Sequence, residues 1–252
     1  MNFETAEQLR SYLKSLPHLN DKGRSARTQK AQEDFYYAVK TYFPHHIDNI
    51  VKETSEFRKF VYTNIEDIFA TTNKASFEAY RGAAKSTVLT RLYTIWKTAI
   101  QNKKRHTVII SSTLDVSKET LDFIKTELED NERLKADFDI QIGTTFKNTW
   151  NEEEIIFKSS NLKFRIKVYG AGKKIRGANW LGFRPDLIIC DDIEDDEEFC
   201  LRLLKKEKVL LVPGKGFNWN EPDHFRIVYL PRVEELADLG NKIERVLSYY
   251  KR

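Results

Sequence analysis

Residues 80–87, "YRGAAKST", have the residue types of a phosphate-binding loop. Such a loop combines backbone N–H groups at a helix N-terminus, a lysine that reaches phosphate and a hydroxyl that binds Mg²⁺. Lys85 and Ser86 supply the two side chains, but alanine occupies both glycine positions of the pattern G-x-x-x-x-G-K-[ST], at Ala79 and Ala84. Because alanine tolerates positive φ poorly, the loop alone fits either a nucleotide site or an ordinary amphipathic helix start.

A group of acidic residues follows the apolar run "LIIC" at 187–190. Nucleotide hydrolases need one carboxylate at the end of a buried strand to hold Mg²⁺ and a second carboxylate to orient the attacking water. Asp191 and Asp192 stand where these groups belong. The acids could instead form a solvated turn, but together with the loop at 80–87 they favour a nucleotide site.

The elements that must position these residues follow from the hydrophobic pattern. Apolar residues recur at helical spacing through residues 1–70, interrupted by a polar break whose basic residues fit a solvated linker or a nucleic-acid contact. The pattern then predicts alternating strands and helices, a hairpin and a final buried parallel strand. The predicted ranges are a strand at 76–80, a helix at 86–100, a strand at 106–112, a helix at 114–138, a hairpin at 154–169 and the strand at 187–190.

The last part of the chain has a different order of elements. The sequence after residue 198 predicts a short helix, a strand at 209–212, a turn rich in Gly, Asn and Pro, a strand at 225–230 and an amphipathic final helix. No internal repeat is seen in the chain.

The bulk composition is that of a globular protein. The 252 residues are 40% hydrophobic, and 42 basic against 38 acidic residues give a net charge of +4, which permits a polyanionic partner without requiring one. The cysteines, Cys190 and Cys200, favour a reducing compartment over a disulfide framework. No apolar run approaches membrane length and the N-terminus lacks a signal-peptide pattern, so we expect a soluble, intracellular chain.

Residues 43–197 resemble the ATPase domain of the large terminase subunit of tailed bacteriophages. The resemblance rests on "FPHHIDNI", "YRGAAKST", the helix ending "LEDNERLKADF" and "KKIRGANWLGFRPDLIICDDIED". It implies a P-loop NTPase fold of the ASCE type, a parallel α/β sheet with flanking helices. The domains would be a helical region at 1–70, an ATPase core at 71–197 and a C-terminal segment at 198–252.

The same resemblance implies roles for individual residues. Lys85 would contact the β- and γ-phosphates, Ser86 and Asp191 would hold Mg²⁺, and Asp192 or Glu194 would activate water. Arg176 resembles an arginine that acts on a neighbouring subunit's ATP, although it could equally be a surface residue. The rest of the ATP-binding loop would be Arg81, Gly82, Ala83, Ala84 and Thr87.

The terminase family translocates double-stranded DNA into procapsids, driven by ATP. The resemblance therefore implies ATP and Mg²⁺ as cofactors, and double-stranded DNA, a portal and a small terminase subunit as partners. It also implies a ring of identical subunits and the cytoplasm of a bacterial host. The coupling strand and the nuclease domain of that family are missing after residue 197, so we expect weak or absent hydrolysis.

Residues 198–252 resemble instead the carboxyl-terminal end of fold-type I aminotransferases, especially the alanine aminotransferases. In that family the arginine of "HFRIVYLP", here Arg226, binds the substrate α-carboxylate through a bidentate pair. The lysine that binds pyridoxal phosphate has no counterpart in this chain, so that cofactor is not expected and Arg226 would be vestigial.

The two resemblances together indicate a chimera of two weakly coupled blocks. The leading hypothesis is a truncated terminase-like ATPase. The alternatives are an inactive remnant of a pyridoxal-phosphate-dependent alanine-type aminotransferase, and a non-enzymatic chimera that binds nothing.

Overall fold

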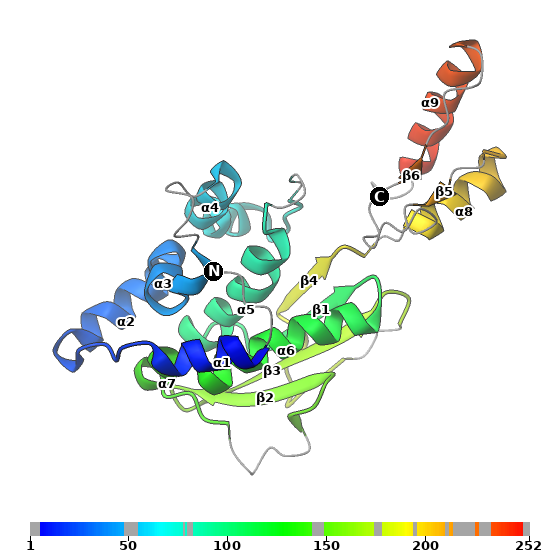
Figure 1. Cartoon of the computed structure of the whole chain (residues 1–252). Coiled ribbons are helices and arrows are strands. Elements are labelled where there is room, and N and C mark those ends of the chain that lie inside the picture. Colours follow the sequence, from blue (N-terminus) through cyan, green and yellow to red (C-terminus); the bar gives the residue numbers. More distant parts are fainter. Residues whose placement is uncertain are drawn as a thin grey trace. The chain divides into compact units, whose positions relative to one another are not determined.

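The structure is a computed structural model of the chain (Figure 1). It describes residues 6–47, 55–77, 79, 83–142, 149–173, 178–193, 196–209, 212–213, 225–226 and 233–248. Contacts divide the chain into two compact units, Met1–Asp191 and Asp192–Arg252, and each unit is considered by itself.

Helices make up the first part of the larger unit, as predicted. Asp34 accepts a hydrogen bond from the backbone N–H of Tyr37 and Ser55 accepts one from Arg58, so both serve as N-caps. The helical elements are α1 (Ala6–Ser15), η1 (Asp21–Gly23), α2 (Arg24–Glu33), α3 (Phe35–Tyr42), η2 (Pro44–His46) and α4 (Glu56–Thr72). The helices α2, α3 and α4 bury their apolar faces in one core with the sheet that follows, whereas α1 buries Leu9, Leu13 and Leu16 in a smaller cluster of its own.

The strand predicted at 76–80 is not formed in the described residues of that range, 76–77 and 79. A strand needs a neighbour with which to pair, and the local pattern does not supply one. The predicted helix at 86–100 is present, but most of it is wound as a π-helix: η3 (Ser86–Leu92), α5 (Tyr93–Ile95) and η4 (Trp96–Ile100).

A four-stranded mixed sheet forms the second layer of this unit. Its strands are β1 (His106–Ser111), β2 (Glu154–Ser159), β3 (Leu162–Gly170) and β4 (Leu187–Asp191), in the order β2-β3-β1-β4. β1 runs parallel to both β3 and β4, whereas β2 runs antiparallel to β3. The predicted α/β class is therefore confirmed. The wholly parallel sheet of a P-loop NTPase is not observed, because the hairpin at 154–170 adds its two strands to the same sheet.

The β2–β3 hairpin follows directly from its turn residues. Ser159 pairs with Leu162, which leaves Ser160 and Asn161 as a two-residue loop with φ of 46° and 67°. Two consecutive left-handed residues make a turn whose twist matches that of the strands, and asparagine is among the residues that enter this region most readily. The predicted hairpin is confirmed.

The helix predicted at 114–138 is divided into α6 (Leu114–Asp130) and α7 (Glu132–Phe138). Asn131 causes the break: its side chain accepts the N–H of Leu134 and caps the second helix. α6 packs on β1 and β3, and α1 packs on α6 (Figure 1).

The strand β4 lies at the edge of the sheet and is only partly buried. Ile188 is 57% exposed and Cys190 is exposed too. The prediction that this strand is parallel is confirmed, whereas the prediction that it is buried is wrong for most of its residues. Its apolar run resembles that of a central strand, but among the described residues only β1 pairs with it.

Gly170 ends β3 where the backbone of α6 begins. A Cβ at this position would lie 2.7 Å from the backbone nitrogen of Leu114 and 3.2 Å from the carbonyl carbon of Thr113. We expect Gly170→Ala to lower the free energy of unfolding by about 1–3 kcal/mol, because backbone atoms must move to admit the methyl group. Chemical denaturation measures the change. The control Gly23→Ala should shift stability by less than about 0.5 kcal/mol, since its Cβ would meet only the flexible end of Arg27 at 3.7 Å. Equal effects of the two substitutions would contradict the steric explanation.

In its described residues, the smaller unit contains two helices and a pair of short strands. α8 (Asp196–Glu207) packs on α9 (Val233–Leu247) around a small cluster formed by Cys200, Leu203 and Val246. β5 (Val212–Pro213) pairs antiparallel with β6 (Phe225–Arg226). Both predicted helices are confirmed. Of the strands predicted at 209–212 and 225–230, the structure shows residue 212 and residues 225–226 in β5 and β6, and residues 210–211 and 227–230 lie outside the described residues.

Candidate functional site

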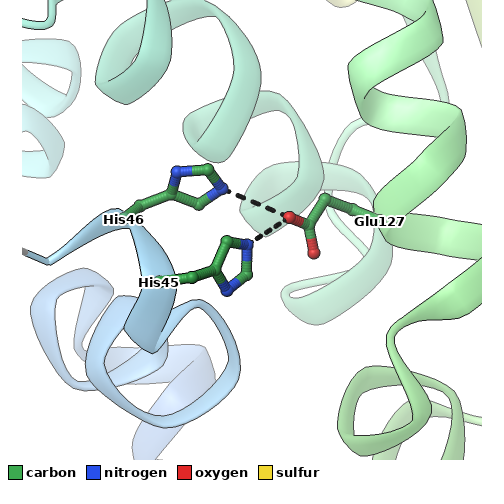
Figure 2. Close-up of side chains that lie close together, drawn as sticks. All are labelled: His45, His46 and Glu127. Atoms are coloured by element: carbon green, nitrogen blue, oxygen red, sulfur yellow. Dashed lines mark hydrogen bonds and ion pairs between the residues drawn. The ribbon is translucent and has the colours of Figure 1, made fainter. Parts of the chain in front are cut away.

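Three potential metal-ligating side chains meet in the core of the larger unit. His45 and His46 end the short helix η2, which starts at Pro44, and Glu127 lies in the last turn of α6. Proline suits the first position of a helix because its φ is already helical and its missing N–H would have no partner there. Figure 2 shows both imidazole rings directed at the glutamate carboxylate. We call these three residues the His–Glu cluster.

The two histidines share one carboxylate oxygen. Nε2 of His45 lies 2.6 Å from Oε1 of Glu127, and Nε2 of His46 lies 3.2 Å from the same atom (Figure 2). The ring centroids of the histidines are 4.0 Å apart. The side chains of His45 and Glu127 are fully inaccessible to solvent, whereas that of His46 is 14% exposed. The cluster therefore reaches solvent only on the side of His46.

Neighbouring side chains hold the cluster in place. Nδ2 of Asn131 donates to the second carboxylate oxygen of Glu127 at 2.9 Å and to the carbonyl of Tyr42 at 2.8 Å. Tyr12 contacts the ring of His45 edge-on, and Phe123 packs against His46. Asn131 also caps α7. Its side chain therefore links the Glu127 carboxylate to the backbone of Tyr42 and to the first turn of α7.

Electrostatics favour an ionised carboxylate and disfavour a charged His46. Burial opposes ionisation of Glu127, but the interactions with the two histidines outweigh it and lower the pKa of the carboxyl to about 2. Burial lowers the pKa of His46, against the opposing effect of Glu127. A buried carboxylate of this kind needs a cation or several hydrogen-bond donors nearby.

The His–Glu cluster was missed by the sequence-based prediction. "PHH" was used only as part of a family resemblance, and Glu127 was not singled out. One signal was available, because Glu127 stands beside the apolar positions Ile124 and Leu128 on the buried face of α6. A carboxylate on the buried face of a helix usually has a specific partner.

The predicted phosphate loop is only partly described. Arg81 and Gly82 lie outside the described residues, and Ala83 is buried. Ala84 adopts φ of 60°, the left-handed conformation for which glycine would be better suited. Lys85, Ser86 and Thr87 follow half-buried at the beginning of η3.

The structure brings the helix after this loop to the predicted acidic residues. Oγ1 of Thr90 donates to Oδ2 of Asp191 at 2.8 Å, so η3 meets the carboxyl end of β4 through a threonine that was not predicted. Asp192 follows with φ of 44° and an exposed side chain. Glu194 and Arg176 lie outside the described residues. The separate roles given to these residues stay predictions.

Arg226 lies on β6, where it pairs with Val212 of β5. Only its backbone is among the described parts of the chain, so the pairing fixes the strand and not the position of the guanidinium.

Comparisons with known proteins find similarity to alanine aminotransferases over a short part of the chain. Glutamate-pyruvate aminotransferase AlaA of Haemophilus influenzae is 57% identical over 60 residues, and its Escherichia coli K12 counterpart is 52% identical over 59 residues. Alanine aminotransferase of Mycobacterium tuberculosis H37Rv is 45% identical over 60 residues. These stretches cover 24%, 23% and 24% of this chain and 15%, 15% and 14% of the respective relatives. No family model matches, and no solved structure is significantly similar.

These findings correct three predictions. The relatives are aminotransferases, and neither the comparisons nor the fold supports a phage terminase with a P-loop and Walker motifs. ATP and Mg²⁺ as cofactors are equally unsupported. The expectation against pyridoxal phosphate is contradicted as well, because aminotransferases use this cofactor. The predicted resemblance to aminotransferases is supported in part.

The prediction of a soluble chain is tested only in its relation to membranes. Among the residues that the structure describes, no helix combines the length and apolar character needed to cross a bilayer.

Proposed function

We propose that the unit Asp192–Arg252 is the carboxyl-terminal segment of an alanine-type aminotransferase. In this proposal the segment binds the α-carboxylate of a 2-amino or 2-oxo acid through Arg226. The identity of 57% over 60 residues to an aminotransferase carries the proposal.

The boundary between the two units supports assigning the match to this segment. The matched stretches of 59 and 60 residues are close in length to the unit that begins at Asp192. We infer that one segment is both the matched stretch and the separate structural unit, while the residues before it belong to a different core. The chain spans only 15% of the length of the relatives from Haemophilus influenzae and Escherichia coli, so the activity of the whole enzyme remains part of the proposal.

The chemistry of the named substrates suits an arginine. Glutamate and pyruvate, which appear in the name of the relatives, both carry an α-carboxylate. A guanidinium matches the two oxygens of a carboxylate with two parallel N–H donors, whereas a lysine ammonium has no such fixed fork. Arg226 is on a strand paired with Val212, which restrains the backbone of the proposed ligand-binding residue.

The described lysines of this unit do not fit the role of a cofactor lysine. A lysine that forms a Schiff base with pyridoxal phosphate is activated by desolvation or by a neighbouring cation. Lys205, Lys206 and Lys208 are exposed, and Lys242 pairs with Asp238 at 2.7 Å. We therefore derive no catalytic step through the cofactor, and the proposal is limited to recognition of the substrate carboxylate.

Titration of the ¹⁵N-labelled chain with pyruvate tests the proposal. We expect pyruvate to shift the Arg226 Nε–Hε resonance, and methyl pyruvate, which lacks the carboxylate, to leave it unchanged. Arg226→Lys should weaken binding by about tenfold or more, because the bidentate pair is lost while the charge stays. Equal responses to pyruvate and its methyl ester, or no response to either, would refute carboxylate recognition.

A further inference from the structure

We propose that His45, His46 and Glu127 bind a Zn²⁺ ion in the larger unit. The proposal is independent of the aminotransferase segment, since all three residues lie before Asp192. It starts from the convergence of two imidazole nitrogens and one carboxylate oxygen, all within 4.8 Å of one another.

The donor set selects the class of metal. Two neutral imidazoles and one carboxylate are a known zinc-binding combination, which leaves a fourth position for water. Calcium and magnesium prefer oxygen ligands and would find only the carboxylate here. The cluster therefore favours a first-row metal that accepts nitrogen ligands. Zinc is the proposed metal because Zn²⁺ commonly takes this ligand set and does not change its oxidation state.

The side chains around the cluster make the kinds of contacts that support metal ligands in proteins. Ligating carboxylates in proteins are usually hydrogen-bonded on their free oxygen, which fixes their orientation. Asn131 makes this bond to Oε2 of Glu127 and leaves Oε1 to the histidines. Apolar and aromatic neighbours, among them Tyr12 and Phe123, exclude water from the rest of the cluster.

The distances of the two histidine nitrogens from the Glu127 carboxylate can be compared with those around a tetrahedral metal ion. Ligands around tetrahedral zinc, each about 2.0–2.1 Å from the metal, lie roughly 3.3 Å from one another. The 3.2 Å between Nε2 of His46 and Oε1 of Glu127 already matches this spacing. The 2.6 Å contact of His45 would have to open by roughly 0.7 Å as two bonds to the metal replace the hydrogen bond. Entry would take place on the side of His46, which reaches solvent.

The positive charge of Arg91 near the cluster is balanced in part by carboxylates, so it is compatible with a bound dication. Arg91 contributes to the lowered pKa of His46. The negative charges of Asp191 and Glu119 in turn interact favourably with the Arg91 guanidinium. The Arg91 guanidinium lies over the ring of Phe123, at 4.9 Å from its centroid, and so on a neighbour of the cluster. A bound Zn²⁺ would connect η2 to α6 and thereby hold the helical region against the helix that covers the sheet.

Metal titration of the full-length chain after removal of bound metal by a chelator tests the proposal. The background variant Cys190→Ser removes an exposed thiol that could bind metal on its own. We expect one Co²⁺ per chain, seen by the visible absorption of a four-coordinate site, and its displacement by Zn²⁺. We expect Zn²⁺ also to raise the melting temperature of the chain.

Three variants decide whether the His–Glu cluster is the site. His46→Ala and Glu127→Gln should each weaken Zn²⁺ binding by about 100-fold or more, because each removes a ligand. His18→Ala, which removes an exposed histidine elsewhere, should bind zinc like the parent. Glu127→Gln keeps the size of the side chain, so it decides the question if His46→Ala does not fold. Absence of metal uptake by the parent, or unchanged affinity in Glu127→Gln, would overturn the proposal.

Discussion

Replacing Asp137 by alanine is expected to lower the free energy of unfolding of the larger unit by about 3–5 kcal/mol. Asp137 lies in α7 with a side chain that is 4% exposed. Its two carboxylate oxygens accept hydrogen bonds from Nε and Nη2 of Arg27 at 2.7 and 2.8 Å, a bidentate pair. Tyr42 donates its hydroxyl to the same carboxylate at 2.7 Å. Loss of Asp137 therefore leaves the buried Tyr42 hydroxyl without its acceptor. It also leaves the Arg27 guanidinium with no counter-charge in this network and with the carbonyl of Asn20 as its remaining acceptor.

The two donors of this network, Arg27 and Tyr42, keep their protons near neutral pH. Burial and the neighbouring Asp137 raise the pKa of the Tyr42 phenol above its ordinary value, so it remains a donor at all ordinary pH values. The hydrogen bond to Asp137 raises the pKa of Arg27 further. The stabilisation expected from the network therefore does not depend on the charge state of either donor near neutral pH.

A rescue experiment separates the unpaired charge from the packing. The triple variant Arg27→Met, Tyr42→Phe, Asp137→Leu replaces the whole network with apolar groups, and we expect it to recover most of the lost stability. Asp122→Ala is the matched control, because its carboxylate is 63% exposed and lies 4.0 Å from Lys125. Urea denaturation followed by circular dichroism should show less than about 1 kcal/mol for the control. An equal loss in both single variants would contradict this account.

The network also shows why part of the fold was accessible from sequence and part was not. The turn at Ser160 and Asn161 was predictable, because local residues decide whether two consecutive left-handed conformations are accessible. The strand at 106–111 was predictable from a short apolar run. The pair of Arg27 and Asp137 was not, because it joins residues 110 positions apart whose types are common on protein surfaces.

The predictions that failed concern features that depend on contacts between residues far apart in the sequence. The run at 187–191 has the composition of a central strand, yet its place at the sheet edge depends on which strands pair with it. The range 76–80 has strand-forming residues, but the described residues there have no partner strand. The His–Glu cluster joins residues 82 positions apart, so adjacency in "PHH" predicts nothing until Glu127 is brought to it by folding. The break at Asn131 is different, since a capping asparagine within a long helical pattern is a local signal that could have been used.

The sequence and the structure lead to different expectations about whether the helical region and the sheet unfold together. The sequence predicts a separate helical region at 1–70, and this boundary stays a prediction. The packing of the larger unit leads us to expect that the helices and the sheet unfold together. Residues of both belong to one hydrophobic cluster that includes Phe35, Ile65 and Ile109. Trp96 is the largest of the fully buried side chains in this cluster and lies between the two parts.

Replacement of Trp96 by alanine is expected to lower the free energy of unfolding by about 3–5 kcal/mol. The indole is fully buried and packs on Phe35 with ring centroids 4.8 Å apart. Its Nε1 donates to the carbonyl of Ala31 at 2.7 Å, which ties η4 to α2. Two further hydrogen bonds join α2 to this region: Gln32 donates to the carbonyl of Ile100 in η4, and Gln101, directly after η4, donates to the carbonyl of Gln32. Alanine would leave a cavity and an unpaired carbonyl in the middle of this contact.

A graded series assigns the loss to its two causes. Trp96→Phe keeps most of the aromatic volume but removes the donor to Ala31, so we expect a smaller loss than in the alanine variant, with about 1–3 kcal/mol from the unpaired carbonyl. Hydrogen exchange should report the consequence for cooperativity. If one core holds both parts, amides of α2 and of β1 lose protection together in Trp96→Ala. If β1 keeps its protection while α2 loses it, residues 1–70 form a separate folding unit and the single-core description is wrong.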